Sequence, residues 1–496
     1  MKIIIPQCSV TNRIKINKRF PTTRIDMFNS RLKLGLALAV SVALTTACSR
    51  EDQADKQKNI TGIDKNPFPS TYKKVDSKPI VISNVTILDG IGGKIEDGEI
   101  LLRDGVIEEI GRSVSSPSGA IEIDGEGKWV TPGIIDNHSH LGVYPSPSTR
   151  SHSDGNEMTA PVTAEVWAEH SIWPQDPGFQ RALAGGVTSL QILPGSANLF
   201  GGRSVTVKNL PNRTVQDMKF PEAPYGIKMA CGENPKRVYG SKGGPMTRMG
   251  NVAGYRQAWA DAKAYQTKWA EFEAEVEDGG SPKAPKRDLN LDTLAGVLDG
   301  DIIVHMHCYR ADDMGTMLDV MKEFDYQIGT FHHAVEAYKI ADKLAENNVC
   351  SAMWADWWGF KMEAYDAIKE NIPMVHAANA CAIVHSDSSL GVQRLNQEAA
   401  KAWADGKRAG IDISQADAWQ WLSANPAKSL GIFDKTGSLE EGKNADVVLW
   451  STDPFSTYAQ ADKVFIDGAM VYDRSNPASW PVSDFELGQI AEGDAK

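Results

Sequence analysis

Short apolar runs typical of β-strands alternate with helical stretches across residues 130–433 of this 496-residue chain. The expected strands lie at 133–136, 188–192, 225–229, 302–306, 327–330, 349–352 and 382–384, and the expected helices at 254–276, 311–323, 335–346 and 395–409. Regular alternation of this kind indicates a parallel sheet whose strands are joined by right-handed crossovers. A (β/α)₈ barrel uses about 250 residues, so the length favours an α/β fold with a closed TIM-type barrel over an open sheet.

Both ends of the folded region are rich in short β-type runs that are broken by Gly-containing turns. Such runs indicate antiparallel hairpins, and they occur both before residue 131 and after residue 436. The expected parts are a small β-sandwich domain built from residues 76–131 and 436–480, a barrel inserted at 132–435, and a tail at 481–496.

The N-terminal region contains a short apolar segment, residues 33–47, which follows Arg31. The segment is too short to span a bilayer, but it has the basic flank and the small-residue end of a signal peptide. We therefore expect a signal peptide over residues 1–47 and export to a bacterial periplasm, with Met27 as an alternative start. A buried hydrophobic helix is the alternative interpretation of the segment.

The residues before Cys48 resemble the site at which bacterial lipoproteins are cleaved and lipidated. We expect lipidation at Cys48, and simple cleavage after Ala47 is the alternative. Residues 48–75 are polar and lack an apolar period, so they are expected to form a tether. A lipid anchor is the only attachment to a membrane that the sequence predicts.

The charge of the chain argues against one class of partner, and its cysteine content against one class of fold. The net charge is −12 and no basic tract exceeds a few residues, which argues against a nucleic-acid partner. Six cysteines in 496 residues cannot form a disulfide scaffold. Cys231, Cys308, Cys350 and Cys381 lie in or beside expected strand ends, so we expect buried free thiols, although export leaves pairing open.

His138 and His140 directly follow an apolar strand. Side chains at positions i and i+2 of a strand point to the same side, so both imidazoles can face one point at its carboxyl end. Barrel enzymes keep their active sites at that end of the strands. Two imidazoles there suit Zn²⁺ or another divalent metal, and two surface histidines on a loop are the alternative.

Four further polar residues follow or interrupt expected strands: Lys228, His307, His333 and Asp387. Starting from His138, the successive separations are 90, 79, 26 and 54 residues. At about 31 residues per βα unit, these separations assign the five positions to strands 1, 4, 5, 6 and 8. All of these side chains can then reach one barrel mouth, which predicts a metal site there.

These residues lie in motifs that resemble the amidohydrolase superfamily, whose members are metal-dependent hydrolases on a (β/α)₈ barrel. The resemblance is closest to the imidazolonepropionase-like branch, which also holds metal-dependent dipeptidases. It covers about residues 79–470. The segments that carry it are 132–140, 184–189, 228–237, 307–313, 336–341, 425–428 and 437–448.

The resemblance implies a role for each polar strand end. His138, His140 and Asp387 look like ligands of the more buried metal. His307 and His333 look like ligands of a second metal or, in one-metal members, like a ligand and a group that polarises the substrate.

Lys228 looks like the lysine that becomes a carbamate and bridges two metals. A bare Lys⁺ would be repelled by metal ions, whereas carboxylation converts it into an anionic oxygen ligand. A snorkelling or ion-paired lysine is the alternative. The expected cofactor is a divalent metal, one or two Zn²⁺ ions, with a carbamate on Lys228.

The implied mechanism uses a metal-bound hydroxide, with Asp387 as general acid and base and His333 as the second catalytic residue. The expected reaction is hydrolysis of an amide, cyclic amide or dipeptide C–N bond in a small-molecule or dipeptide substrate. A deaminase or a lactonase on the same scaffold is an alternative, and so is a non-catalytic metal- or ligand-binding lipoprotein. The sequence leaves open the substrate, the number of metals and whether the chain forms a homo-oligomer.

The chain departs from the family pattern at two strand ends. Strand 8 ends in His385-Ser386-Asp387 instead of Gly-Thr-Asp, and strand 6 in His332-His333-Ala334 instead of Glu-His-Gly. We expect His305 and His332, which neighbour the ligands, to support them or to pack rather than to bind metal.

Arginine and tryptophan side chains are candidates for contact with the substrate. Arg203, Arg237 and Arg248 follow expected strands, and a guanidinium can hold a carboxylate through two hydrogen bonds. Surface arginines without such a role are the alternative. The tryptophans at 354–358 either line a pocket or pack in the core.

Overall fold

The computed structural model describes residues 61–480. Both sheets of the fold belong to one unit, which begins at Asp64. The predicted signal peptide at 1–47, the predicted lipidation site Cys48 and the predicted tail at 481–496 lie outside the described residues.

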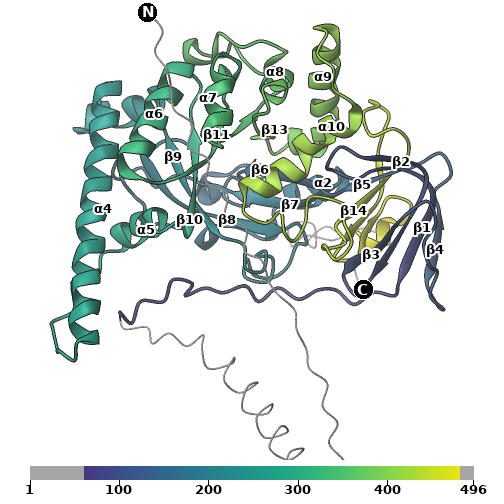
Figure 1. The fold of residues 1–496 in the computed structure, drawn as a ribbon, viewed down its shortest axis with the longest axis horizontal. Coiled ribbons are helices and arrows are strands. Elements are labelled where there is room, and N and C mark those ends of the chain that lie inside the picture. Colours follow the sequence, from purple (N-terminus) through teal and green to yellow (C-terminus); the bar gives the residue numbers. More distant parts are fainter. Residues whose placement is uncertain (1–60, 481–496) are drawn as a thin grey trace, which may run out of the picture. The chain divides into compact units, whose positions relative to one another are not determined.

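Eight strands form the wall of a nearly closed barrel and hydrogen-bond to one another in chain order (Figure 1). They are β6 (Ile134–Ser139), β7 (Val187–Ile192), β8 (Phe200–Lys208), β9 (Tyr225–Ala230), β10 (Ile302–His307), β11 (Ile328–His332), β12 (Cys350–Met353) and β13 (Ala382–Val384). Beyond the last strand, the backbone N–H of Asp387 donates to the carbonyl of His138 in the first strand at 3.2 Å. The predicted α/β barrel is confirmed.

One barrel strand runs against the predicted direction. β8 is antiparallel to both of its neighbours, β7 and β9, whereas the sequence predicts a parallel sheet and no strand at 200–208. Residues 193–199 join β7 to β8. This link is too short for the crossover of about a dozen or more residues that a parallel strand requires, so the chain turns back as a hairpin.

The helices connect and cover the barrel strands, and α4 to α8 lie around the barrel in Figure 1. The helices of the described region are α2 (Pro177–Ala184), α3 (Glu233–Tyr239), α4 (Arg248–Glu277), α5 (Leu289–Leu298), α6 (Ala311–Phe324), α7 (Ala341–Glu346), α8 (Asn371–Ala377), α9 (Leu395–Arg408), α10 (Gln415–Trp419) and α11 (Ala424–Ser429). The long helix α4 begins at a capping residue, because the hydroxyl of Thr247 accepts the N–H of Gly250 at 3.0 Å. Four of these helices match the predicted ones, with α7 shortened by a 3₁₀ turn at 337–340.

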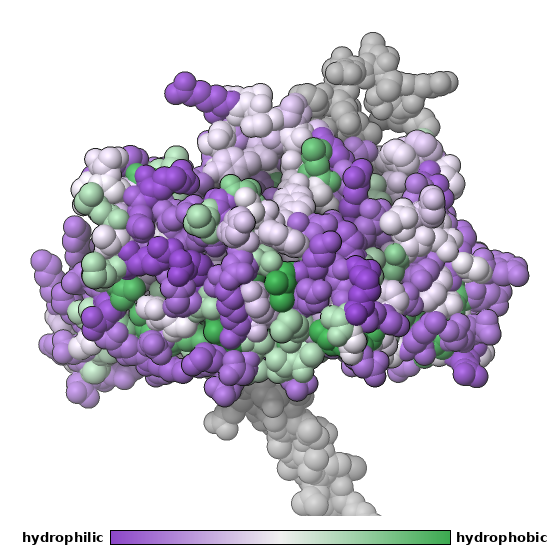
Figure 2. Space-filling model, turned by 90° about the horizontal axis from the view of Figure 1, so that it is seen from above, coloured by the Kyte–Doolittle hydropathy of each residue, from purple (hydrophilic) through white to green (hydrophobic). Residues whose placement is uncertain are grey.

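Between residues 61 and 480, no helix combines the length and the apolar composition needed to cross a bilayer. The face of the molecule in Figure 2 is mostly hydrophilic, and its apolar residues lie in small groups. Scattered apolar residues of this kind are normal on a protein surface.

Strands from both chain ends form a second, mixed sheet beside the barrel (Figure 1). Its strands are β1 (Ile80–Leu88), β2 (Lys94–Arg103), β3 (Val106–Gly111), β4 (Ile121–Asp124), β5 (Trp129–Pro132), β14 (Val447–Trp450), β15 (Ala461–Ile466) and β16 (Ala469–Asp473). The two chain ends meet where β5 pairs with β14 in antiparallel register. The predicted contribution of both ends is therefore seen, while the two-layered sandwich stays a prediction.

Both faces of the sheet are buried at its central strand β14. In β14, Val448 and Trp450 join the apolar core of the barrel, whereas Val447 and Leu449 join a separate apolar cluster with β1 and β2. Successive strand residues point to opposite faces. One face of β14 therefore packs on the barrel, and the side chains of the opposite face pack with those of β1 and β2. The sheet is thereby anchored to the barrel by its own side chains.

Two disulfides join neighbouring barrel strands, Cys231 with Cys308 and Cys350 with Cys381. The prediction of buried free thiols is therefore wrong. Each pair stands at matching positions of adjacent parallel strands, β9 with β10 and β12 with β13, and the Cα atoms lie 5.2 and 4.4 Å apart. These separations allow a disulfide, and they follow from strand register, which the sequence alone does not reveal.

Residues 64–79 form no helix or strand. The N–H of Thr71 donates to the carbonyl of Gln216 at 2.9 Å, and the hydroxyl of Ser70 donates to the carbonyl of Lys219 at 2.6 Å. The described part of the predicted tether is therefore attached to the barrel, between β8 and β9.

A buried cluster of charges links the barrel to the second sheet. Nζ of Lys208, at the end of β8, lies 3.1 Å from Asp446 and 2.8 Å from Asp467. The hydroxyl of Tyr72 donates to Asp467 at 2.6 Å, and that of Thr436 donates to Asp446 at 2.9 Å. Burial raises the pKa of Asp446, and the positive charge of Lys208 opposes that rise. Lys208 is therefore the buried cation shared by both carboxylates, and Nζ of the half-exposed Lys74 lies 4.0 Å from Asp467 as well.

Replacing Lys208→Met should lower the free energy of unfolding by about 3–5 kcal/mol, because two buried carboxylates would lose their cation. Urea-induced unfolding measures this loss. Lys322→Met, on the exposed surface of α6, is the matched control and should change the free energy by less than about 0.5 kcal/mol. Similar losses in the two variants would contradict the role given to Lys208.

Candidate active site

The polar strand ends predicted from the sequence meet at one mouth of the barrel. His138 lies in β6, Lys228 in β9 and His307 at the end of β10. His333 follows β11, and Asp387 follows β13. These are the first, fourth, fifth, sixth and eighth strands of the barrel, as the spacing predicts.

Asp387 is the centre of this cluster. Its Oδ1 lies 3.3 Å from Nε2 of His140 and 3.6 Å from Nε2 of His138. Its Oδ2 lies 3.7 Å from Nε2 of His333. Three imidazoles thus present the same ring nitrogen to one carboxylate.

The other ring nitrogen, Nδ1, of each of these histidines is held by a neighbour. Nδ1 of His140 lies 2.8 Å from the carbonyl oxygen of Leu193, Nδ1 of His138 lies 2.8 Å from Nδ1 of His332, and Nδ1 of His333 lies 2.7 Å from Nε2 of His385. A hydrogen bond at one ring nitrogen sets the orientation of the imidazole and leaves the other nitrogen for a ligand. The contacts at Nδ1 therefore fix the positions of the three Nε2 atoms.

His332 and His305 extend this arrangement into the barrel. Nε2 of His332 lies 3.1 Å from Nδ1 of His305, so the rings of His138, His332 and His305 form a chain. Burial and, to a smaller extent, the charge of Lys228 lower the pKa of His305 to about 3. Both residues contact the candidate ligand His138, directly or through each other, as the sequence analysis expects of supporting residues.

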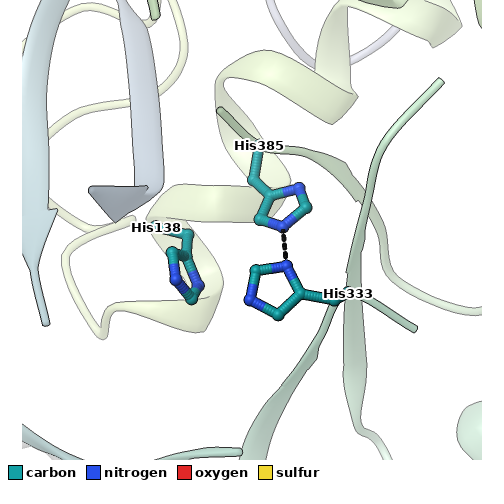
Figure 3. A group of neighbouring side chains, drawn as sticks. All are labelled: His138, His333 and His385. Carbon is teal, nitrogen blue, oxygen red and sulfur yellow. Dashed lines mark hydrogen bonds between the residues drawn. The ribbon is translucent and has the colours of Figure 1, made fainter. Parts of the chain in front are cut away.

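Figure 3 shows His138, His333 and His385 turned toward one another, with the hydrogen bond between His333 and His385. Two groups of side chains bring their ligand atoms within 4.8 Å of one another: His138, His333 and His385, and His138, His140 and Asp387. His385 is a functional candidate that sequence reasoning missed. Its signal in the sequence is an imidazole two positions before Asp387, where the family pattern has glycine.

His307 lies at the edge of the cluster. Its ring is 5.0 Å from the ring of His333, and its Nε2 lies 3.3 Å from the side-chain nitrogen of Asn234. Its Nδ1 is buried and has no hydrogen-bond partner within residues 61–480. A buried ring nitrogen without a partner indicates a place where water or an ion completes the site.

Lys228 is buried in the barrel, with Nζ 3.5 Å from Nε2 of His138. Within the described part of the chain it forms no ion pair, and its side chain is fully buried. Burial lowers the pKa of the Lys228 ammonium to about 7, although the charge of Asp387 opposes the shift. A large fraction of the amine is therefore uncharged near neutral pH.

Burial also determines the charges of the other groups. It lowers the pKa of His138 and of His333 well below the usual range, and that of His385 to about 4. Burial alone would raise the pKa of Asp387, but the hydrogen bond from His140 and the positive charge around the carboxylate outweigh it, so this pKa is lowered. At neutral pH these neutral imidazoles surround an ionised carboxylate.

The backbone is strained at two residues that face each other across the site. His333 has a φ of +59° and Asp387 a φ of +48°. Residues other than glycine rarely adopt such values, although His and Asp tolerate them better than most. Strain of this kind is retained where the surrounding structure holds a side chain in a required position.

This donor set fits a divalent metal. Neutral imidazole nitrogens and a carboxylate are the ligands that zinc and similar borderline ions prefer. With their Nδ1 atoms engaged elsewhere, His138 and His140 turn Nε2 toward each other, 3.3 Å apart, and toward Oδ1 of Asp387. The unpartnered Nδ1 of His307 is a further nitrogen that is available to an ion at this site.

The three predicted substrate-binding arginines are not brought to the cluster. Arg203 donates to Thr293 of α5 at 2.9 Å, and its guanidinium lies 4.1 Å from the ring centre of Trp167. Arg237 is exposed on α3. Arg248, at the start of α4, is paired with carboxylates. A substrate role for these arginines therefore gains no support from the structure.

A barrel with imidazoles and a carboxylate at its mouth is the architecture of metal-dependent hydrolases. The model of the amidohydrolase family matches residues 129–472. The chain belongs to the amidohydrolase family and is a hydrolase that acts on carbon–nitrogen bonds. Members of this superfamily use divalent metals, and the resemblance seen in the sequence motifs is confirmed.

Two relatives and one solved structure illustrate the similarity. Amidohydrolase tasK of Hapsidospora irregularis is 32% identical over 427 residues, which make up 82% of this chain and 43% of that protein, so the match spans less than half of its length. An imidazolonepropionase of Mesorhizobium japonicum is 24% identical over 388 residues, 74% of this chain and 89% of that protein. The crystal structure of an amidohydrolase from Thermotoga maritima MSB8 is 35% identical, with a TM-score of 0.73 over 80% of this chain and 100% of that chain.

His385→Leu should weaken zinc binding by about 10- to 100-fold, because Nδ1 of His333 would lose its partner. Competition with a chelator measures the affinity. His385→Gln places an amide near the position of Nε2 and should restore most of the affinity if His385 acts through the hydrogen bond. A loss in both variants would instead identify His385 as a ligand, and no loss in either would exclude both roles.

Proposed function

We propose that this protein is an exported, metal-dependent amidohydrolase that hydrolyses an amide, cyclic amide or dipeptide C–N bond in a small substrate. The observation that carries the proposal is the convergence of the Nε2 atoms of His138, His140 and His333 on the carboxylate of Asp387. An ionised carboxylate among these imidazoles can serve both as a metal ligand and as a base, which supports a catalytic role as well as a binding role.

One or two Zn²⁺ ions are the proposed cofactor. The residues proposed to hold metal are His138, His140, Lys228, His307, His333 and Asp387. A divalent ion at this site supplies Lewis acidity, which lowers the pKa of water and polarises a carbonyl oxygen.

Asp387 is placed to move the proton of the reaction. Its lowered pKa keeps it ionised at neutral pH, so it can accept a proton from the attacking water. The same carboxyl group can then donate that proton to the departing nitrogen as the C–N bond breaks. With a single metal bound, His333 remains free to hydrogen-bond the carbonyl oxygen of the substrate.

Asp387→Asn should lower kcat by at least about a hundredfold, because the amide cannot carry the proton. Most of the metal should remain bound, since the amide keeps one oxygen ligand. The measurements are turnover of dipeptides, cyclic imides and lactones, and the metal content of the purified enzyme. Hydrolysis of lactones alone would favour the lactonase alternative.

Asp319→Asn, an exposed aspartate on α6, is the matched control for this substitution and should keep the kcat of the unmodified enzyme. Full activity of Asp387→Asn would refute the assignment of Asp387 as general base. Loss of activity together with loss of the metal would contradict the expected retention of metal and identify Asp387 as an essential ligand.

We further propose that Lys228 carries a carbamate. Its amine is buried beside His138 and forms no ion pair within residues 61–480, so an uncharged amine is available for reaction with carbon dioxide. The N–C bond forms as the amine loses a proton, and the product is an anionic oxygen ligand. This group supplies the negative charge that two adjacent cations need.

¹³C-labelled bicarbonate should give a carbamate signal in the NMR spectrum of the metal-loaded protein. The signal should be absent from Lys228→Met, in which no amine is available, and retained in Lys322→Met. A spectrum without a carbamate signal under saturating bicarbonate would overturn this part of the proposal and leave the hydrolase assignment intact.

Export is proposed from two independent observations. The apolar segment at 33–47 has the features of a signal peptide, and Cys48 follows it as the proposed lipidation site. The two barrel disulfides suit an oxidising compartment such as the periplasm, because such bonds are rare in the cytosol.

A further inference from the structure

Four aromatic residues form a continuous surface that begins at the candidate ligand His333, and we name them the aromatic wall: Tyr309, Trp354, Trp357 and Phe360. Trp354 directly follows β12 and stacks on His333, with ring centres 4.5 Å apart and planes 22° apart. Trp357 and Phe360 continue from Trp354 at 5.9 and 5.8 Å. Phe360 is thus two ring contacts away from His333.

Tyr309 closes the wall on the side of the other candidate ligand. Its ring lies 4.5 Å from the ring of His307 and 6.3 Å from that of Phe360. The wall therefore extends from both outer histidines of the cluster, His307 and His333, and it is built by the segments that follow β10 and β12.

Exposure increases along the wall away from the metal ligands. Tyr309 and Trp354 are 5% and 9% exposed, whereas Trp357 and Phe360 are 42% and 58% exposed. Trp354 lies in a buried apolar cluster with Tyr309, in line with the core packing that is one of the two sequence-based interpretations of the tryptophans. The outer pair leaves apolar ring surface in water, and each of its two rings contacts Trp354. Exposed apolar side chains gathered beside a candidate site mark a binding site more often than scattered ones do.

The cations beside the wall are already paired. Nζ of Lys361 lies 4.3 Å from the ring centre of Tyr309, but it also lies 3.1 Å from a carboxylate oxygen of Glu233. Arg248 is paired with Asp313 and Glu363. Neither cation is therefore free to bind a negatively charged substrate group on the wall. The wall offers an apolar surface for binding.

We propose that the aromatic wall binds an aromatic or similarly large apolar group of the substrate, attached next to the C–N bond that is broken. This inference rests on the hydrolase function proposed above. The stacking of Trp354 on His333 makes the wall continuous with the site, so an occupant of the wall and the reacting bond belong to one molecule. Burial of an aromatic ring against Trp357 and Phe360 favours substrates with such a ring by about tenfold or more.

The test compares substrates that differ only in a benzyl or a methyl group. The pairs are 5-benzylhydantoin with 5-methylhydantoin, and the dipeptides Ala-Phe and Phe-Ala with Ala-Ala. The zinc-loaded enzyme should show a kcat/KM at least about tenfold higher for the benzyl member of a pair that it hydrolyses. In the double variant Trp357→Ala/Phe360→Ala this ratio should fall to near one.

Tyr458→Ala is the matched control, because Tyr458 is an aromatic residue that is 87% exposed between β14 and β15. Its ratio should equal that of the unmodified enzyme. Equal kcat/KM values for benzyl and methyl substrates in the unmodified enzyme would overturn the proposal, and so would a preference that survives in the double variant. If the double variant changed its oligomeric state but kept the preference for benzyl substrates, the wall proposal would be overturned. Trp357 and Phe360 would then belong to a contact between copies of this chain.

A binding measurement separates failure of this inference from failure of the proposed function. If none of these substrates is hydrolysed, isothermal titration of the zinc-loaded protein with the two hydantoins still tests the wall. Tighter binding of 5-benzylhydantoin by about tenfold or more, lost in Trp357→Ala/Phe360→Ala, would support the wall and refute only the reaction. Equal binding of the two hydantoins would overturn the wall itself.

Discussion

Imidazole rings packed inside the barrel mouth constrain the rest of the site. Seven of the ten histidines of the chain lie there: His138, His140, His305, His307, His332, His333 and His385. Charged rings at such distances would repel one another, and burial further disfavours the charged form. A neutral ring has one donor and one acceptor nitrogen, and both need partners when the ring is buried. Several of these rings are therefore positioned by contacts between their own nitrogen atoms.

This requirement explains why three different groups lie behind the candidate ligands. A carbonyl oxygen, the ring of His332 and the ring of His385 each take up one Nδ1, and each contact turns an Nε2 toward Asp387. Orientation is thus supplied by residues that do not touch the carboxylate. The unusual His385 belongs to this supporting set, and it fills a position at which glycine could make no hydrogen bond.

The sequence predicts the barrel and the positions of the candidate ligands because both depend on regular spacing. His138 and His307 stand at the ends of apolar strands, and one barrel unit has a nearly constant length. The reversal of β8 depends on the length of one link, and the pairing of Cys231 with Cys308 depends on strand register. The role of His385 depends on where a side chain points beyond the end of a strand, where the alternation of faces no longer applies.

The second sheet holds the strand on which the site begins. β5 ends at Pro132 and β6 starts at Ile134, so one residue, Gly133, separates the sheet from the barrel strand that carries His138. The N–H of Gly133 donates to the carbonyl of Asp446 at 2.8 Å, and a Cβ at this position would lie 2.1 Å from the hydroxyl oxygen of Thr188. Only glycine allows so close an approach between the strand and its neighbour. Asp446 is also a partner of Lys208, so the buried charge cluster holds the start of β6 as well as the sheet. The geometry around Asp387 therefore depends on contacts made by both ends of the chain.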